Sequence, residues 1–252
     1  MTTRARILAF ALPALTVMAC FATSSVARAD NFSGVVELFT SQGCSSCPRA
    51  DAELARLAQD GDVLALSFHV DYWNYLGWAD TLSSAASTER QYGYARTLRR
   101  KNVYTPQAVI NGQDHANGAD RTAVSSIVNR LSSTGAGLSV EVTADIDADG
   151  LRISVGPGTG KADIVAVYFD DTTTVDIKRG ENAGRAITYH HSVRNMETVG
   201  MWDGKAVNLK LPASVMSAHP GRGCAILLQM VGEDGAPGRI LGAAMIEPRK
   251  ST

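Results

Sequence analysis

Hydrophobic and polar positions follow two different rhythms along the chain, and the change falls near residue 133. In the first half, short runs rich in β-forming residues alternate with segments whose apolar residues have helical spacing. The predicted strands cover residues 34–40, 63–70 and 107–110, and the predicted helices cover residues 48–59, 87–100 and 120–131. Asn111-Gly112 indicates a hairpin after the third strand. This order predicts a compact α/β domain over residues 30–132.

A stretch of small residues at 133–137 reads as a linker, and the helical spacing disappears beyond it. Asp-Gly pairs supply turns between short apolar runs, which is typical of β-structure. The predicted strands cover residues 138–146, 151–155, 164–169, 185–190, 206–211, 224–231 and 240–246. Seven short strands favour an all-β, sandwich-like domain over residues 138–252. The expected fold class is therefore an α/β domain followed by a β-sandwich-like domain.

The first 29 residues have the pattern of a secretory signal peptide. Arg4 and Arg6 precede a run of apolar residues, and Ala27-Arg28-Ala29 is an A-x-A cleavage signal. Cleavage after Ala29 would deliver the protein to the bacterial periplasm or the medium, where disulfides persist. A lipoprotein attached at Cys20 is the weaker alternative, because Met18 fits a lipobox poorly. No later segment reaches the ~18 apolar residues that a membrane span requires.

The composition excludes several classes of protein. Of 252 residues, 45% are hydrophobic and 19% are charged, which is typical of a globular chain with a substantial core. The 24 basic residues are balanced by 25 acidic ones, so the chain lacks the positive charge of a nucleic-acid binder.

The candidate chemistry lies in Cys44-Ser45-Ser46-Cys47, between the first predicted strand and the first predicted helix. At a helix start, unpaired backbone N–H groups and the positive end of the dipole favour a thiolate. Cys44 is expected to be the exposed attacking thiol and Cys47 the buried thiol that resolves a mixed disulfide. Cys224, next to an apolar run, is expected to be a buried and inert thiol.

Thr105-Pro106 stands directly before the third predicted strand, where a proline is tolerated and a cis bond would form a deliberate turn. The order strand, C-x-x-C, helix and later Thr-Pro-strand resembles the thioredoxin-like superfamily over residues 33–132. The chain also resembles the exported family called Domain of Unknown Function 1223. Its motifs match residues 36–48, Phe68-His69-Val70-Asp71-Tyr72-Trp73, Tyr104-Thr105-Pro106-Gln107 and residues 179–185. Arg49 departs from the family pattern, in which a second proline is expected.

The resemblance to thioredoxins implies roles for residues beyond the two cysteines. Glu37 would be a buried acid that accepts the proton of the resolving thiol, although strand alternation could equally turn it toward solvent. Thr105 and Pro106 would shape the substrate groove. Tyr72 and Trp73 could anchor a peptide at its rim, or could merely cover the edge of the sheet.

These observations predict an exported thiol–disulfide oxidoreductase that acts on protein or small thiol substrates, with an unknown redox partner and no organic cofactor. One alternative is a periplasmic copper chaperone, in which His69 joins Cys44 and Cys47 in a soft Cys₂His site. Another is a non-catalytic binding module with a permanent structural disulfide. The direction of the redox reaction stays open at this point, because Ser45 and Ser46 carry no decisive tuning signal.

Overall fold

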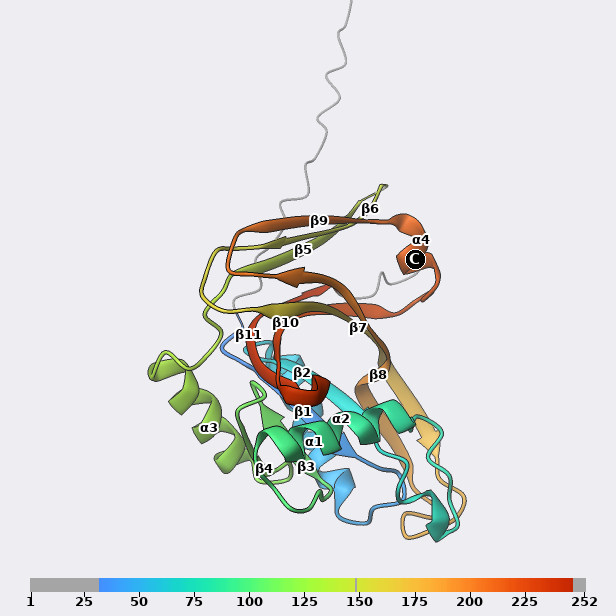
Figure 1. The fold of residues 1–252 in the computed structure, drawn as a ribbon. Helices are drawn as coiled ribbons and strands as arrows, with labels where there is room; N and C mark the ends of the chain where they lie inside the picture. Colours follow the sequence, from blue (N-terminus) through green and yellow to red (C-terminus); the bar gives the residue numbers. More distant parts are fainter. Residues whose placement is uncertain (1–31, 148, 247–252) are drawn as a thin grey trace, which may run out of the picture.

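A computed structural model describes residues 32–147 and 149–246 of the chain (Figure 1). The strands are β1 (Val35–Thr40), β2 (Leu64–His69), β3 (Gln107–Ile110), β4 (Asp114–Asn117), β5 (Val142–Asp147), β6 (Gly150–Val155), β7 (Ala162–Asp176), β8 (Ala186–Trp202), β9 (Val207–Pro212), β10 (Gly223–Val231) and β11 (Pro237–Ile246). The α-helices are α1 (Cys47–Asp60), α2 (Ala85–Thr97), α3 (Arg121–Ser133) and α4 (Ala213–Ser217). Two short 3₁₀ helices are η1 (Asn74–Leu76) and η2 (Glu233–Gly235).

One mixed sheet contains strands from both halves of the chain. Its order is β11-β10-β7-β8-β2-β1-β3-β4, and β5-β6-β9 forms a second, smaller sheet. β1 is parallel to β2 and antiparallel to β3, while β3 and β4 form the expected hairpin. The two halves meet where β8 pairs in parallel with β2, with Ser67 opposite Ser192.

The predicted fold class is wrong. Each half contains the strands and helices that the hydrophobic pattern predicts, but the strands of the second half do not close a sandwich of their own. Four of them, β7, β8, β10 and β11, extend the sheet that begins with β1 and β2. The molecule is therefore a mainly β protein built on an eight-stranded mixed sheet, and not an α/β thioredoxin-like domain followed by a β-sandwich.

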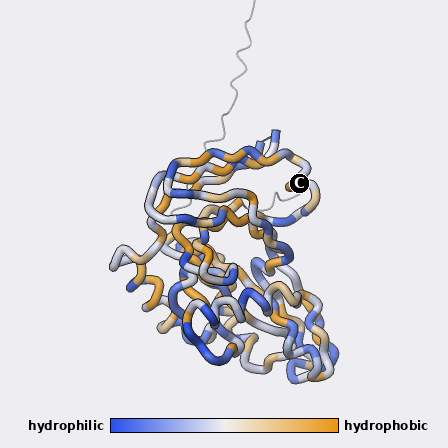
Figure 2. The backbone as a smooth tube through the Cα atoms, in the orientation of Figure 1, coloured by the Kyte–Doolittle hydropathy of each residue, from blue (hydrophilic) through white to orange (hydrophobic). Residues whose placement is uncertain are grey.

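Three hydrophobic cores hold the layers together. On one face of the large sheet, Leu66 and Phe68 of β2 join Val167 and Phe169 of β7, and Tyr94 of α2 packs among them. On the opposite face, α1 and α3 cover the β1–β3 end in a second core. The small sheet covers the same face over β7, β10 and β11 in a third core. Figure 2 shows the hydrophobic positions following these strands.

The start of α1 is fixed by local sequence. Ser46 is the N-cap residue and Pro48 lies in the first turn, where the N–H that proline lacks would have no helical partner. Gly61 ends the helix in a left-handed conformation with φ of 74°. The helix therefore begins at Cys47 and places its N-terminal turn beside the end of β1.

The expected signal peptide, residues 1–29, and the alternative lipid site at Cys20 lie outside the described residues. Within the part of the chain that the structure describes, no helix is long and apolar enough to cross a membrane.

Candidate functional site

Cys44 and Cys47 form a disulfide at the N-terminus of α1. Their sulfur atoms are 2.16 Å apart and their Cα atoms 5.4 Å apart. The first turn of α1 contains no acidic residue, so the positive end of the helix dipole faces the sulfur atoms without a carboxylate of the same turn to offset it. Ser45 and Ser46, between the cysteines, are exposed.

The expectation that Cys44 is exposed is wrong for this disulfide form. Cys44 is only 2% exposed and Cys47 is fully buried. Residues 177–185, which join β7 to β8 and which we call the β7–β8 segment, contact the loop that carries Cys44. The Nδ2 atom of Asn182 donates hydrogen bonds to the carbonyl oxygens of Gln42 and Cys44, each at 2.9 Å.

Glu181 contacts the same loop from its exposed side. One of its carboxylate oxygens accepts a hydrogen bond from the Ser45 N–H at 3.2 Å. The residue pattern gives no geometric reason to place residue 182 beside residue 44. Only the quoted match over residues 179–185 marked this segment in the sequence.

Asp51 is a buried acid on α1, the helix that begins at Cys47. It follows Cys47 by four residues, so both side chains lie on the same face of α1, and both are buried. Its Oδ1 atom accepts a hydrogen bond from the Thr40 hydroxyl at 2.7 Å, and its Oδ2 atom has no hydrogen-bond partner among the described residues. Burial raises the pKa of Asp51 to about 7, although the neighbouring His69 lowers it.

His69 ends β2 in the same buried region. Its Nδ1 atom lies 2.8 Å from Oδ2 of Asp80, and neither side chain is exposed to solvent. Asp80 also accepts hydrogen bonds from the backbone N–H groups of Gln42 and Leu82. Asp80 therefore links the histidine to the residue two positions before Cys44.

Tyr189 of β8, in the second half of the chain, packs against the buried group formed by Asp51, His69 and Asp80. Its ring packs edge-on against His69, with centroids 4.7 Å apart. Burial raises the pKa of its hydroxyl, and the nearby carboxyl groups of Asp51 and Asp80 add to the increase. The sequence interpretation gave no role to Asp51, Asp80 and Tyr189, and it marked Asn182 only as part of the matched residues 179–185. Of the three without a role, Asp51 carries a visible signal, its helical spacing from Cys47.

Glu37 does not lie with the dithiol. It is buried, which decides between the two orientations left open by the sequence, but alternation along β1 places it on the face of the sheet opposite α1. Arg90 of α2 forms an ion pair with its carboxylate at 2.7 Å, and Tyr94 donates a hydrogen bond to it. The proposed role of Glu37 as proton acceptor for Cys47 therefore fails on geometry.

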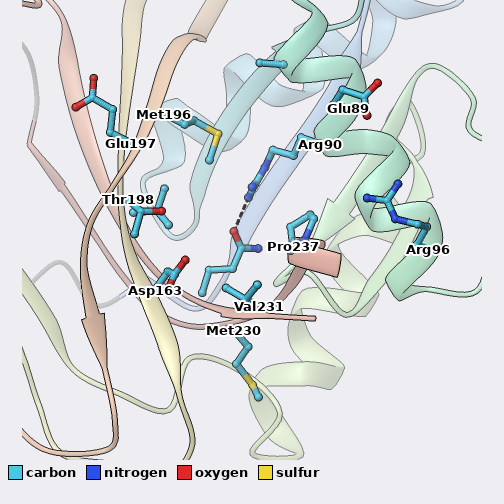
Figure 3. A pocket seen from close by; sticks show the side chains of 14 residues that line it. Glu89, Arg90, Arg96, Asp163, Met196, Glu197, Thr198, Met230, Val231 and Pro237 are labelled. Atoms are coloured by element: carbon cyan, nitrogen blue, oxygen red, sulfur yellow. Dashed lines mark hydrogen bonds between the residues drawn. The ribbon is translucent and has the colours of Figure 1, made fainter. Parts of the chain in front are cut away.

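Arg90 reaches from α2 into a cavity of about 440 Å³ between α2 and strands β7, β8 and β10 (Figure 3). Its guanidinium also donates to Oε1 of Gln229 at 2.9 Å. Both members of the Glu37–Arg90 pair therefore have hydrogen-bond partners within the core on this side of the sheet. These contacts indicate a structural role for the pair.

The residues expected to bind substrate lie near one another, and the ring centroids of Tyr72 and Trp73 are 6.2 Å apart. Nε1 of Trp73 donates to the Thr105 hydroxyl at 2.8 Å, and a methyl group added to Gly43 would lie 3.2 Å from Cβ of Trp73. Trp73 and Thr105 are therefore next to the loop that carries Cys44. The Thr105–Pro106 bond is cis, and Pro106 is buried. Tyr72 packs partly against the central core, and burial raises its pKa to about 12.

In the copper alternative His69 joins Cys44 and Cys47, and in this structure the two cysteines are joined to each other. Among the residues described, no three histidine, cysteine, aspartate or glutamate side chains are grouped so that they could hold a metal ion. Nδ1 of His69 is committed to Asp80. Cys224 is buried in the third core, and burial raises its pKa to about 12, which keeps the thiol protonated.

Comparison with known proteins agrees with the family resemblance seen in the motifs, and it does not show a placement in the thioredoxin-like superfamily. No curated protein matches the chain. A crystal structure of a protein from Agrobacterium tumefaciens is 48% identical, with a TM-score of 0.80 over 88% of this chain and 96% of that one. HBP35 of Porphyromonas gingivalis is 12% identical, with a TM-score of 0.56 over 90% of this chain and 80% of that one, a likeness of fold alone.

The model of one family, "Protein of unknown function (DUF1223)", matches residues 35–229. This match spans every residue of the site around the disulfide, from Gln42 to Tyr189, and strands of both sheets. The chain therefore belongs to the DUF1223 family of proteins of unknown function.

Proposed function

We propose that the protein performs thiol–disulfide exchange through Cys44 and Cys47, on protein or small thiol substrates. The observation that carries the proposal is the disulfide at the N-terminus of a 14-residue helix whose first turn has no acid. In the reduced form, that position favours a thiolate over a thiol, and the thiolate is the reacting species.

In the reducing direction, the Cys44 thiolate attacks one sulfur of a substrate disulfide. The substrate S–S bond breaks, one substrate sulfur leaves as a thiolate, and a mixed disulfide with Cys44 forms. The Cys47 thiolate then attacks the Cys44 sulfur and releases the second substrate thiolate. The substrate has gained two electrons, and the Cys44–Cys47 disulfide has re-formed. The same steps in reverse oxidise a substrate dithiol.

The second step requires that the Cys47 thiol lose its proton, and Asp51 is the described residue best suited to accept it. It lies one helical turn from Cys47 on the same buried face, and one of its carboxylate oxygens has no described partner. A carboxyl group with a pKa of about 7 changes charge near neutral pH, as a general base must. Asp51 thus takes the role that the sequence interpretation assigned to Glu37.

We also propose that the protein works outside the cytoplasm, in the periplasm or the medium. The residue pattern of positions 1–29 supports this location, and a disulfide is stable there.

A redox titration tests the exchange reaction. The protein is equilibrated in glutathione buffers of graded potential, and the state of Cys44 and Cys47 is read by alkylation and mass. A midpoint between about −270 and −120 mV is expected, the range of dithiols that exchange. A midpoint below about −300 mV would mark a permanent bridge and overturn the proposal. Cys224→Ser is the matched control, since it removes a cysteine outside the site and should leave the midpoint unchanged.

A further inference from the structure

The β7–β8 segment contacts the loop that carries Cys44 through the buried side chain of Asn182. Asn182 is 1% exposed, and its amide bridges two carbonyl oxygens, one of them on Cys44 itself. These partners lie 140 and 138 residues away in sequence. The amide therefore fixes the backbone on both sides of Gly43.

The segment also holds Asn182 in this orientation from within. Nη1 of Arg185 donates to Oδ1 of Asn182 at 3.0 Å. At the base of the segment, Ile177 N–H donates to the Arg185 carbonyl at 2.9 Å, and Gly184 N–H donates to the Ile177 carbonyl at 2.8 Å. The neighbouring residues Glu181, Ala183 and Gly184 are exposed. The buried attachment of the segment to the Cys44 loop is therefore the Asn182 side chain, and the Glu181–Ser45 hydrogen bond is an exposed one.

The burial of Cys44 and Cys47 conflicts with thiol–disulfide exchange, in which a reactant must reach a sulfur atom. An attacking thiolate or phosphine must approach a sulfur atom along the S–S axis, and both cysteines are almost completely buried. The two serines between them are exposed, so the obstruction is local. The β7–β8 segment contacts the backbone of Cys44 itself, so its position and the accessibility of the disulfide are connected.

We propose that Asn182 is the residue that controls access to the Cys44–Cys47 disulfide, and that the β7–β8 segment opens before any reactant reaches the sulfur atoms. The inference rests on the proposed function for its purpose, because it describes access to that same pair. In the closed state the disulfide is protected from small reductants. Loss of the Asn182 hydrogen bonds shifts the segment toward the open state.

The size of the effect follows from the hydrogen bonds that close the segment. One net hydrogen bond changes an equilibrium roughly fivefold, so removal of two should raise the open fraction about 25-fold. When opening is a rapid pre-equilibrium, the rate of reduction rises by the same factor.

The experiment measures the rate at which tris(2-carboxyethyl)phosphine reduces the disulfide of the full chain. The phosphine attacks one sulfur and the S–S bond breaks. Water then supplies the oxygen of the phosphine oxide, and both sulfurs end as thiols. Asn182→Ala should be reduced about 25-fold faster than the parent protein. Arg185→Ala should give a smaller increase, because it removes only the bond that orients the amide.

Asn208→Ala is the matched control, an exposed asparagine on β9 of the other sheet, and its rate should equal that of the parent. Equal rates for the parent, Asn182→Ala and Arg185→Ala would overturn the inference. If Asn182→Ala fails to fold, the Arg185→Ala rate alone decides. The phosphine needs no exchange activity, so a midpoint below about −300 mV with faster reduction of Asn182→Ala would refute only the proposed function.

Discussion

Replacement of Asp51 by asparagine should remove one pH-dependent component of stability. Burial raises the pKa of Asp51 from 3.8 to about 7. Because the pKa is higher in the folded state, the folded protein binds more protons than the unfolded chain between about pH 4 and about pH 7. The stabilisation is therefore complete below the lower value, is lost as the pH rises through this window, and changes no further above it.

The magnitude follows from the separation of the two pKa values. Each unit corresponds to about 1.4 kcal/mol, so a separation of about three units gives about 4 kcal/mol for the whole window. Asparagine is neutral at every pH and can still accept the hydrogen bond from Thr40. The free energy of unfolding of Asp51→Asn should therefore exceed that of the parent by an amount that grows about 3 kcal/mol between pH 5 and pH 8.

Urea unfolding of the oxidised proteins at pH 5, 6, 7 and 8 measures this difference. Asp51→Asn changes one carboxyl group and leaves His69, Asp80 and Tyr189 in place. Asp60→Asn is the control, an exposed aspartate on the same helix, and its stability should parallel that of the parent. A difference between Asp51→Asn and the parent that is the same at all four pH values would refute the assignment of a raised pKa to Asp51.

Three further substitutions test the packing that positions the site. Glu37→Gln should lower the free energy of unfolding by about 3–5 kcal/mol in urea titrations, because it leaves the Arg90 charge buried without a counterion. The redox midpoint of Cys44 and Cys47 should stay unchanged in this variant, since Glu37 does not contact the dithiol. Gly112→Ala should destabilise strongly in thermal unfolding, because φ is 64° and the added Cβ would collide with the Gly238 carbonyl oxygen. Leu66→Ala should cost about 2–5 kcal/mol, and a value below 1 kcal/mol would contradict its place in the central core.

Local structure was predictable from the sequence because local patterns determine it. The Asn111-Gly112 turn, the apolar run of β2 and the helix that begins at Cys47 all appear close to their expected positions. The start of α2 was expected two residues late, since Ser84 caps the helix by accepting a hydrogen bond from the Ser87 N–H. The Cys44–Cys47 pair was likewise visible, because only two residues separate its members at the start of the helix.

Long-range pairing was not predictable from the same patterns. Nothing in the residues of β8 distinguishes a strand that pairs within a sandwich from one that continues the sheet beside β2. The error about Glu37 has a similar origin. Alternation along β1 shows that residues 37 and 38 face opposite sides, but it cannot show which side α1 covers. Asn182 is beyond such reasoning, because its partners lie about 140 residues away.

The shared sheet predicts that residues 32–137 do not fold on their own. The central core combines Leu66 and Phe68 of β2 with Val167, Phe169 and Leu227 from the second half, all of them buried. Each such side chain contributes about 1.5–3 kcal/mol when removed from water, so exposing several of them costs on the order of 10 kcal/mol. That loss is comparable to the whole stability of a domain, about 5–15 kcal/mol.

Circular dichroism and urea unfolding of residues 32–137 would measure this dependence, with the chain from residue 32 to residue 252 as the control. We expect no cooperative unfolding transition for the fragment and one for the longer chain. A cooperative transition in the fragment would show that β1, β2 and the first three α-helices stabilise one another without β8. In that case the fold that carries the disulfide would not depend on the strands of the second half. If the fragment shows no cooperative transition, the second half of the chain, whose β7–β8 segment contacts the Cys44 loop, is also required for the fold that holds the disulfide.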